Sequence, residues 1–134
     1  MSAQTAYREY KQIQVKTANR EKLLIMLYQG CIKFLKFSKK SIEENNIEAA
    51  NNYILRSQDI IRELMNTLDR EKGGEIADNL YNLYDFMYRE LIIANIKKDA
   101  EKIEMVEEMM SELLESWQQI ANVKKKKPKL NVNK

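Results

Sequence analysis

Apolar residues recur every three or four positions along four long stretches of the chain, which cover residues 20–44, 47–71, 76–96 and 99–120. This spacing is typical of α-helices that bury one face. At 1.5 Å per residue, each stretch would form a helix roughly 30–37 Å long. Because only a few residues separate the stretches, successive helices should pack antiparallel. The pattern therefore predicts an all-α protein built as an antiparallel, up-down-up-down four-helix bundle.

The first stretch carries two adjacent apolar stripes. Both follow helical spacing, which places them side by side on one helix. A helix with two apolar faces contacts more than one neighbour, so we expect it to be central in the bundle. The stripes are Leu24, Leu27, Cys31, Leu35, Ser38 and Ile42, and Leu23, Met26, Gly30, Phe34 and Phe37.

Short polar residues and glycines mark where the helices should begin and end. Asn19 and Asp99 are the predicted N-caps of the first and fourth helices, because their side-chain oxygens can accept a hydrogen bond from a free amide of the first turn. Asn45 and Glu48 have the spacing of a capping box at the start of the second helix. The pair Gly73–Gly74 should end that helix, since glycine adopts left-handed backbone geometry without strain.

The composition agrees with one helical domain. The chain has 134 residues and a mass of 15.9 kDa, with 44% hydrophobic and 32% charged residues. Only three glycines and one proline are present, which is too few for the turns of a β-sandwich or barrel.

The positive charge is concentrated at the C-terminus. Residues 124–134 contain six of the 23 basic residues and no acidic one, so the formal net charge of +3 becomes −3 for the rest of the chain. We interpret this segment as a disordered, solubilising Lys-rich tail, and contact with nucleic acid or an acidic membrane is the alternative. The predicted organisation is an N-terminal segment (residues 1–17), a bundle (residues 18–123) and the tail.

The residue types that support catalysis or metal binding are scarce. The chain has no histidine, which removes the usual general base and the commonest metal ligand. Its single cysteine, Cys31, allows neither an internal disulfide nor a thiolate cage and should be a buried, inert thiol. Carboxylate metal sites in bundles also use histidines from facing helices, so a glutamate cluster on the fourth helix should be a solvated face. Its members are Glu104, Glu107, Glu108 and Glu112. We therefore expect no catalytic residue, metal or cofactor.

Hydropathy gives no sign of a membrane segment. No stretch approaches the roughly 18 apolar residues that a membrane span needs. Residues 1–10 are polar and lack the apolar core of a signal peptide. We expect a cytoplasmic protein without membrane insertion.

Two groups of tyrosines suggest a surface for a partner. Tyr81, Tyr84 and Tyr88 are spaced to lie along one side of the third helix, where they either border the core or offer an aromatic strip to a partner helix. Tyr7 and Tyr10 lie in the N-terminal segment, where no long helix is predicted to bury them. That segment either docks onto the bundle, waits for a partner or stays disordered.

Several motifs, taken in order, resemble the FliS family of flagellar secretion chaperones. The resemblance extends over residues 7–120. Two positions depart from it, because Asn19-Arg20 stand where the family often has Ser-Pro, and Phe86 stands where Tyr is frequent. The matching motifs are YKQIQVKTA (10–18), LLIMLYQG (23–30), GGEIADNL (73–80) and LYDFM (83–87), with Ala94-Asn95, Asp99 and Trp117.

The resemblance implies a non-enzymatic, cytoplasmic export chaperone with a four-helix bundle fold. Such a chaperone binds the C-terminal segment of newly made flagellin in apolar grooves and keeps it competent for flagellar type III secretion. The resemblance also leaves room for contacts with components of the flagellar export apparatus and for a homodimer. The acidic body of the chain argues against a nucleic-acid partner.

The resemblance, together with helical-face positions, gives two sets of candidate binding residues. Tyr7 and Tyr10 match a family segment that occupies part of the groove when flagellin is absent, so we expect them to cap the groove. The candidate groove residues are Leu24, Leu27, Tyr28, Cys31, Tyr84, Tyr88 and Leu91.

The alternative interpretation is a helical-bundle adaptor or regulator that binds another protein or an RNA, the latter through the Lys-rich tail. The two interpretations differ in salt dependence. Apolar groove binding should survive raised salt, whereas phosphate binding should weaken steeply. An enzyme is the least supported class, since the sequence gives no indication of a pocket with convergent polar groups.

Overall fold

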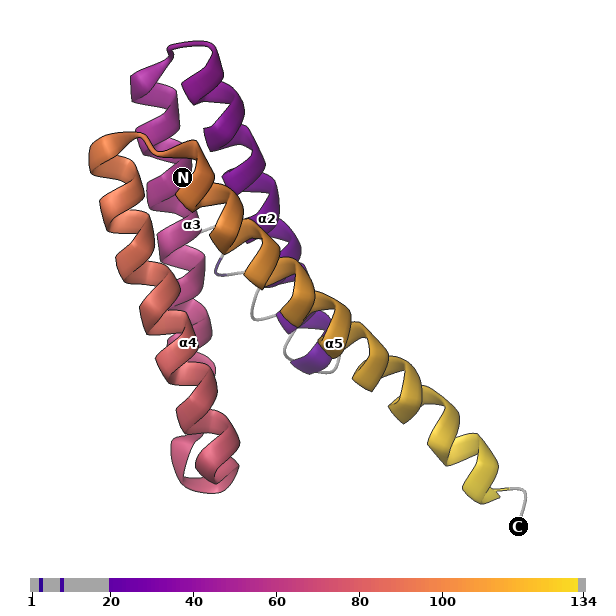
Figure 1. Cartoon of the computed structure of the whole chain (residues 1–134). Helices are drawn as coiled ribbons and strands as arrows, with labels where there is room; N and C mark the ends of the chain where they lie inside the picture. The colour runs from indigo at the N-terminus through magenta and orange to yellow at the C-terminus, as the bar shows by residue number, and fades with distance from the viewer. Residues whose placement is uncertain (1–2, 4–7, 9–19, 133–134) are drawn as a thin grey trace.

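The structure is a computed structural model that describes residues 3, 8 and 20–132, with side chains described as far as residue 123. Its helices are α2 (Arg20–Glu43), α3 (Ile47–Thr67), α4 (Arg70–Lys97) and α5 (Ala100–Val132), and the described residues form no strand. Successive helices run in opposite directions (Figure 1). The predicted all-α four-helix architecture is confirmed.

Each helix packs against two others, and the pairs that lie diagonally across the bundle do not approach one another closely. The α2–α3 contact is the most extensive and the α4–α5 contact the least. In Figure 1, α5 leans away from α4 as it runs toward the C-terminus, so the two helices diverge at the end of the bundle where α4 begins. The bundle is therefore closed at one end and spread at the other.

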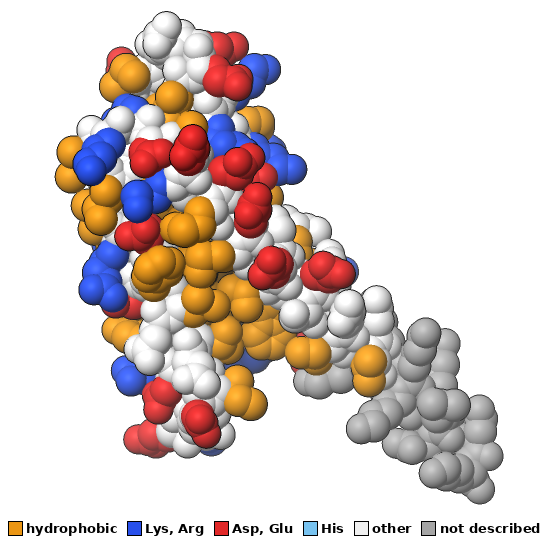
Figure 2. All heavy atoms as spheres, in the orientation of Figure 1, with side chains coloured by type: hydrophobic (Ala, Val, Ile, Leu, Met, Phe, Trp, Pro, Cys, Tyr) orange, Lys and Arg blue, Asp and Glu red, His pale blue; other side chains and the backbone are white. Residues whose placement is uncertain are grey.

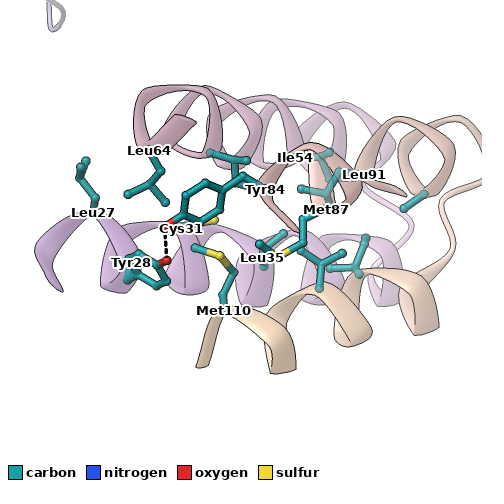
Figure 3. Packing of buried hydrophobic residues seen from close by; sticks show 14 residues of the cluster. Leu27, Tyr28, Cys31, Leu35, Ile54, Leu64, Tyr84, Met87, Leu91 and Met110 are labelled. Carbon is teal, nitrogen blue, oxygen red and sulfur yellow. Dashed lines mark hydrogen bonds between the residues drawn. The ribbon is translucent and has the colours of Figure 1, made fainter. Parts of the chain in front are cut away.

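The core contains side chains from all four helices, as the stripes predicted (Figure 3). Burying one large apolar side chain stabilises a fold by about 1.5–3 kcal/mol, so this cluster is the main source of stability. Its members are Leu27, Tyr28, Cys31, Leu35, Ile54, Ile61, Leu64, Tyr84, Met87, Leu91, Ala94, Ile103, Val106 and Met110.

The turn between α2 and α3 differs from the predicted capping box by one residue. Asn46, not Asn45, is the N-cap of α3, and its Oδ1 accepts a hydrogen bond from the Ala49 amide at 3.1 Å. Asn45 instead has a φ of 59°. Asparagine tolerates this left-handed conformation better than most residues, so Asn45 ends α2 and its neighbour becomes the cap.

The N-cap predicted for the fourth helix is confirmed. The Asp99 side chain accepts a hydrogen bond from the Lys102 amide at 3.2 Å. Lys98 precedes it with a φ of 51°, which turns the chain out of α4. Asn19, the cap predicted for the first helix, lies outside the described residues.

The boundary between α3 and α4 was predicted wrongly. We expected Gly73–Gly74 to end the second helix, but α3 ends at Thr67 and α4 begins at Arg70. Asp69 starts α4 by accepting a hydrogen bond from the Lys72 amide at 3.0 Å. This side-chain cap closes the turn before the glycines are reached.

The glycine pair instead produces a kink inside α4. Gly74 has φ 55° and ψ −132°, which separates the first turn from the rest of the helix. A Cβ atom on Gly73 would come within 2.6 Å of the Ala77 Cβ, so this position also requires glycine. The straight part of the helix thus begins close to the predicted residue 76.

The two ends of the chain differ in what the structure describes. Residues 1–17, including Tyr7 and Tyr10, lie outside the described residues except for positions 3 and 8. The disordered Lys-rich tail predicted for residues 124–134 stays a prediction. The backbone of α5 is helical as far as Val132 and includes Pro128.

Replacing Gly74 with alanine should lower the free energy of unfolding by about 1–3 kcal/mol, because Gly74 has a backbone conformation that L-residues rarely adopt. Gly30→Ala is the matched control. A Cβ there would make an ordinary 3.4 Å contact with the Ile60 Cδ1 atom within a helix. Urea denaturation of both variants measures the difference, and equal stabilities would contradict the kink.

Candidate partner-binding groove

An open groove of about 710 Å³ lies at the spread end of the bundle. All four helices contribute to it: the start of α2, the end of α3, the start of α4 and the second half of α5. Because α4 and α5 diverge here, none of the helices α2 to α5 covers the apolar faces that the others turn inward (Figure 1). The lining residues are Arg20, Glu21, Leu23, Leu24, Leu27, Asn66, Thr67, Leu68, Asp69, Lys72, Gly73, Ile76, Ala77, Leu80, Tyr84 and Trp117.

The groove has an apolar interior and a polar rim. The rim contains charges of both signs, Arg20 and Lys72 against Glu21 and Asp69, so it has no strong preference for one charge. Most other lining residues are aliphatic or aromatic. This combination suits an amphipathic segment that turns its apolar side inward and keeps its polar side in water.

Ile76 is the most exposed apolar residue of the groove, at 73%. It follows the Gly74 kink directly, so the break in α4 carries this side chain to the groove instead of the core. Ile76 is followed one turn later by Leu80, which is half-buried against the core. An exposed isoleucine contributes no burial free energy to the stability of the free protein. The position of Ile76 therefore fits an anchor for a partner.

A hydrogen-bonded tyrosine pair lies at the base of the groove. The hydroxyls of Tyr28 on α2 and Tyr84 on α4 are 2.5 Å apart, and both side chains are buried (Figure 3). Their rings meet edge to face, with centroids 6.4 Å apart. Tyr84 also lines the groove. The pair joins the two diagonally placed helices, which have no close backbone contact, and keeps two buried hydroxyls satisfied.

Burial raises the pKa of both hydroxyls. For Tyr84, desolvation is the main cause, and the neighbouring Tyr28 adds to it. For Tyr28, desolvation is partly offset by hydrogen bonds with Tyr84 and Trp117. Both hydroxyls therefore stay neutral at physiological pH, and Trp117 on α5, which lines the groove, is packed against the same core.

The candidate groove residues predicted from the sequence fall into three groups. Leu24, Leu27 and Tyr84 line the groove. Tyr28, Cys31 and Leu91 are fully buried in the core. Tyr88 lies apart, between α3 and α4.

Tyr81 and Tyr88 are half-buried beneath arginines rather than forming an open strip. The Arg62 guanidinium lies 5.1 Å from the Tyr88 ring centroid and donates a hydrogen bond to its hydroxyl. The Arg70 guanidinium lies 4.4 Å from the Tyr81 ring centroid. These contacts fit the interpretation in which the two rings border the core.

Cys31 is a buried thiol, as its position on the apolar stripe predicted. Its Sγ donates a long hydrogen bond to the Ser57 carbonyl oxygen at 3.7 Å. Burial raises the pKa of the thiol to about 12, so it is protonated and unreactive at neutral pH.

The candidate residues predicted from the sequence leave out six apolar residues that line the groove: Leu23, Leu68, Ile76, Ala77, Leu80 and Trp117. All but Ala77 lie on apolar stripes, but a helical stripe does not show where a neighbouring helix stops covering it. The glycine pair before Ile76 was the one available signal for this end of α4, and it was interpreted as a helix end.

A second apolar surface runs along the seam between α4 and α5, where Figure 2 shows hydrophobic side chains gathered on one face. The ion pair between Lys102 Nζ and Glu90 Oε1, at 2.8 Å, shows which sides of the two helices meet. Phe86 lies one turn before Glu90 and is 40% exposed, and Met105 and Met109 lie on the matching side of α5. The seam offers further apolar surface outside the groove.

Neither a metal centre nor a membrane span is found where the structure describes the chain. No group of three acidic or cysteine side chains is placed to hold a metal ion within the described residues. In the same part of the chain, no helix combines the length and the apolar character needed to cross a membrane.

The tyrosine pair makes stability sensitive to alkaline pH. Both hydroxyls ionise near pH 10 in the unfolded chain but remain protonated in the folded one. The unfolded state therefore loses protons that the native state keeps, and the free energy of unfolding should fall above pH 10, by up to about 1.4 kcal/mol per pH unit for each group. Urea denaturation between pH 8 and 11 measures this decline.

In that experiment Tyr84→Phe and Tyr28→Phe should each flatten the decline, since each removes one of the two groups. Tyr81→Phe, outside the buried pair, is the control. A decline of the same steepness in all four proteins would show that the pair does not cause it.

The sequence matches a family model and several known proteins. The family model "Flagellar protein FliS" matches residues 3–124. A Bacillus subtilis flagellar secretion chaperone FliS is 36% identical over 126 residues, covering 94% of this chain and 93% of the relative. The Salmonella typhimurium protein of the same name is also 36% identical over 126 residues, covering 90% of this chain and 93% of the relative.

A solved structure supports the fold independently. The crystal structure of a bacterial flagellar chaperone matches this one with a TM-score of 0.74 at 17% identity, covering 90% of this chain and 98% of the other. The fold, the family model and the relatives therefore agree. The chain belongs to the FliS family, whose named members are chaperones of flagellar secretion rather than enzymes.

Proposed function

We propose that this protein is a cytoplasmic export chaperone for flagellin. It binds the disordered C-terminal segment of flagellin, holds it as helices against the apolar groove, prevents premature polymerisation and keeps it competent for flagellar type III secretion. The observation that carries the proposal is the open apolar groove at the spread end of the bundle, in which Ile76 is largely exposed.

Flagellin's own packing explains why such a groove would be useful. The terminal segments of flagellin pack as helices inside the filament, so a free subunit carries amphipathic chain that can associate with other subunits. A groove that is apolar inside and polar at its rim can bind this chain by the helix-in-groove mode. The bound segment is then unavailable for polymerisation.

The size of the contact should exceed the groove itself. Ordering a disordered segment costs several kcal/mol, and such partners bury on the order of 1,000–3,000 Å². The apolar seam between α4 and α5 supplies additional surface next to the groove. We therefore propose that the flagellin segment extends from the groove along this seam.

Ile76→Glu should weaken binding of a C-terminal flagellin fragment at least about tenfold, because a charge replaces an exposed apolar anchor worth about 1.5–3 kcal/mol. Ile96→Glu is the matched control, since Ile96 lies on the same helix, is 78% exposed and does not line the groove. Both substitutions are at exposed positions, so the fold should tolerate them. Isothermal titration calorimetry measures the affinities.

Two further readouts separate this proposal from its alternative. Circular dichroism should show that the fragment gains helicity on binding, and the affinity should change little between 50 mM and 500 mM salt. Equal effects of the two glutamate substitutions would contradict the groove. Preferential binding of an RNA, with affinity lost at high salt, would favour the adaptor function through the Lys-rich tail.

The N-terminal segment is proposed to act as a tethered competitor for the groove. Arg20, the first residue of α2, lies on the groove rim, so the preceding segment joins the bundle next to the proposed binding site. A tethered segment competes at a high effective concentration. Tyr7 and Tyr10 would shield the apolar surface until flagellin displaces them.

Replacing Tyr7 and Tyr10 together with alanine should then tighten flagellin-fragment binding or promote self-association. Calorimetry and analytical ultracentrifugation of the double variant measure the two effects. If affinity and oligomeric state both stay as in the wild type, the segment is not a competitor.

A further inference from the structure

A cluster of three aromatic rings lies on the outer side of α2 and α3, apart from the groove. The Tyr53 ring stacks on Phe34, with centroids 6.1 Å apart, and meets Phe37 at a tilt, with centroids 5.3 Å apart. None of the three belongs to the hydrophobic core or lines the groove. Phe37 is 39% exposed. Aromatic surface of this kind is costly to leave in water and is enriched at interfaces.

Cations surround these rings. The Lys33 Nζ lies 5.7 Å from the Phe37 centroid, and the Arg56 guanidinium lies 5.7 Å from the Phe34 centroid. Lys33, Lys36 and Phe37 also line a shallow cavity of about 330 Å³, together with Gln29, Ile32 and Leu114. The cavity places an apolar recess directly beside the cations.

Lys33, Lys36 and Arg56 form no ion pair with a described carboxylate. Lys36 also lines a cavity that contains Glu104 and Glu107. Lys39, one turn further along α2, differs from them because its Nζ lies 2.7 Å from a carboxylate oxygen of Glu107. The fold thus neutralises the cation that faces α5 and leaves those beside the aromatic rings available.

We infer that this face, formed by Phe34, Phe37, Tyr53, Lys33, Lys36 and Arg56, is a second docking surface, and that it binds an acidic protein segment carrying an apolar anchor. The carboxylates pair with the cations, and the anchor enters the recess beside Phe37. Charge complementarity sets the class of partner, and the rings supply contact area with few degrees of freedom to lose. This surface is separate from the proposed flagellin groove and does not depend on it.

The geometry favours an acidic protein over a nucleic acid. Nucleic-acid bases bind by stacking on open aromatic faces. Here the ring faces are already taken, since Tyr53 stacks on Phe34 while Lys33 and Arg56 lie over the faces of Phe37 and Phe34. The chain outside its Lys-rich tail also carries a net charge of −3, which repels a polyphosphate and an anionic bilayer. A short acidic segment would contact only the cations of this face, so the net charge of the whole bundle matters less for its binding.

The test uses the full chain and two synthetic 16-residue helical peptides. The acidic probe has Leu and Phe on one face, flanked by glutamates, and the basic probe has lysine at every glutamate position. We expect the acidic probe to bind and to shift amide resonances around Phe37, while the basic probe does not bind. Lys33→Glu/Arg56→Glu should weaken the acidic probe at least about tenfold and allow the basic probe to bind.

Arg89→Glu/Lys97→Glu is the matched control. It makes the same change in net charge on α4 and breaks only the exposed ion pair between Arg89 and Asp85. It should bind the acidic probe as the wild type does. Thermal melts establish that both variants are folded, and binding of the flagellin fragment should be unchanged in Lys33→Glu/Arg56→Glu, which keeps this test separate from that of the groove.

Several results would overturn the inference. They are no binding of the acidic probe to the wild type, equal binding to Lys33→Glu/Arg56→Glu, and the same loss in the control variant. Tighter binding of oligo-uridine or of phosphatidylglycerol vesicles at this face would assign it to a different partner class. Self-association that is lost only in Lys33→Glu/Arg56→Glu would assign it to a second copy of the chain.

Discussion

The divergence of α4 and α5 is the constraint on which the other features depend. Where the two helices lie close, Met87, Leu91, Val106 and Met110 close the interior. Where they separate, no other described helix covers the inward faces of the first turns of α2 and α4, and a groove results. A four-helix bundle whose helices kept the same spacing over their whole length would bury the same residues and leave no groove for a partner.

The buried tyrosine pair links two helices at this open end. Spread helices lose packing, and the hydrogen bond between Tyr28 and Tyr84 joins α2 to α4 where their backbones do not meet. Trp117 on α5 packs against the same core and lines the groove. The base of the groove is therefore built from buried side chains of the bundle.

The groove and the outer face of α2 and α3 differ in chemical character. The groove is apolar with a rim of mixed charge, and it suits a segment that gains helical structure on binding. The outer face of α2 and α3 combines aromatic rings with cations that form no ion pair with a described carboxylate, and it suits an acidic segment that is recognised by charge. If both proposed surfaces bind partners, one small bundle can contact two at once, because neither surface uses the residues of the other.

The sequence by itself determined the helices, their capping at Asp99 and most of the core, because apolar periodicity and cap chemistry are local properties. It also carried the motifs that point to the family. Only the tertiary structure decided which of the other stripe residues are covered: it placed Tyr28 and Leu91 in the core and Ile76 in the groove. It also showed that Asp69 starts α4 and that Gly74 kinks it. The physical reason is that burial depends on how helices cross, and crossing is set by packing between residues far apart in the chain.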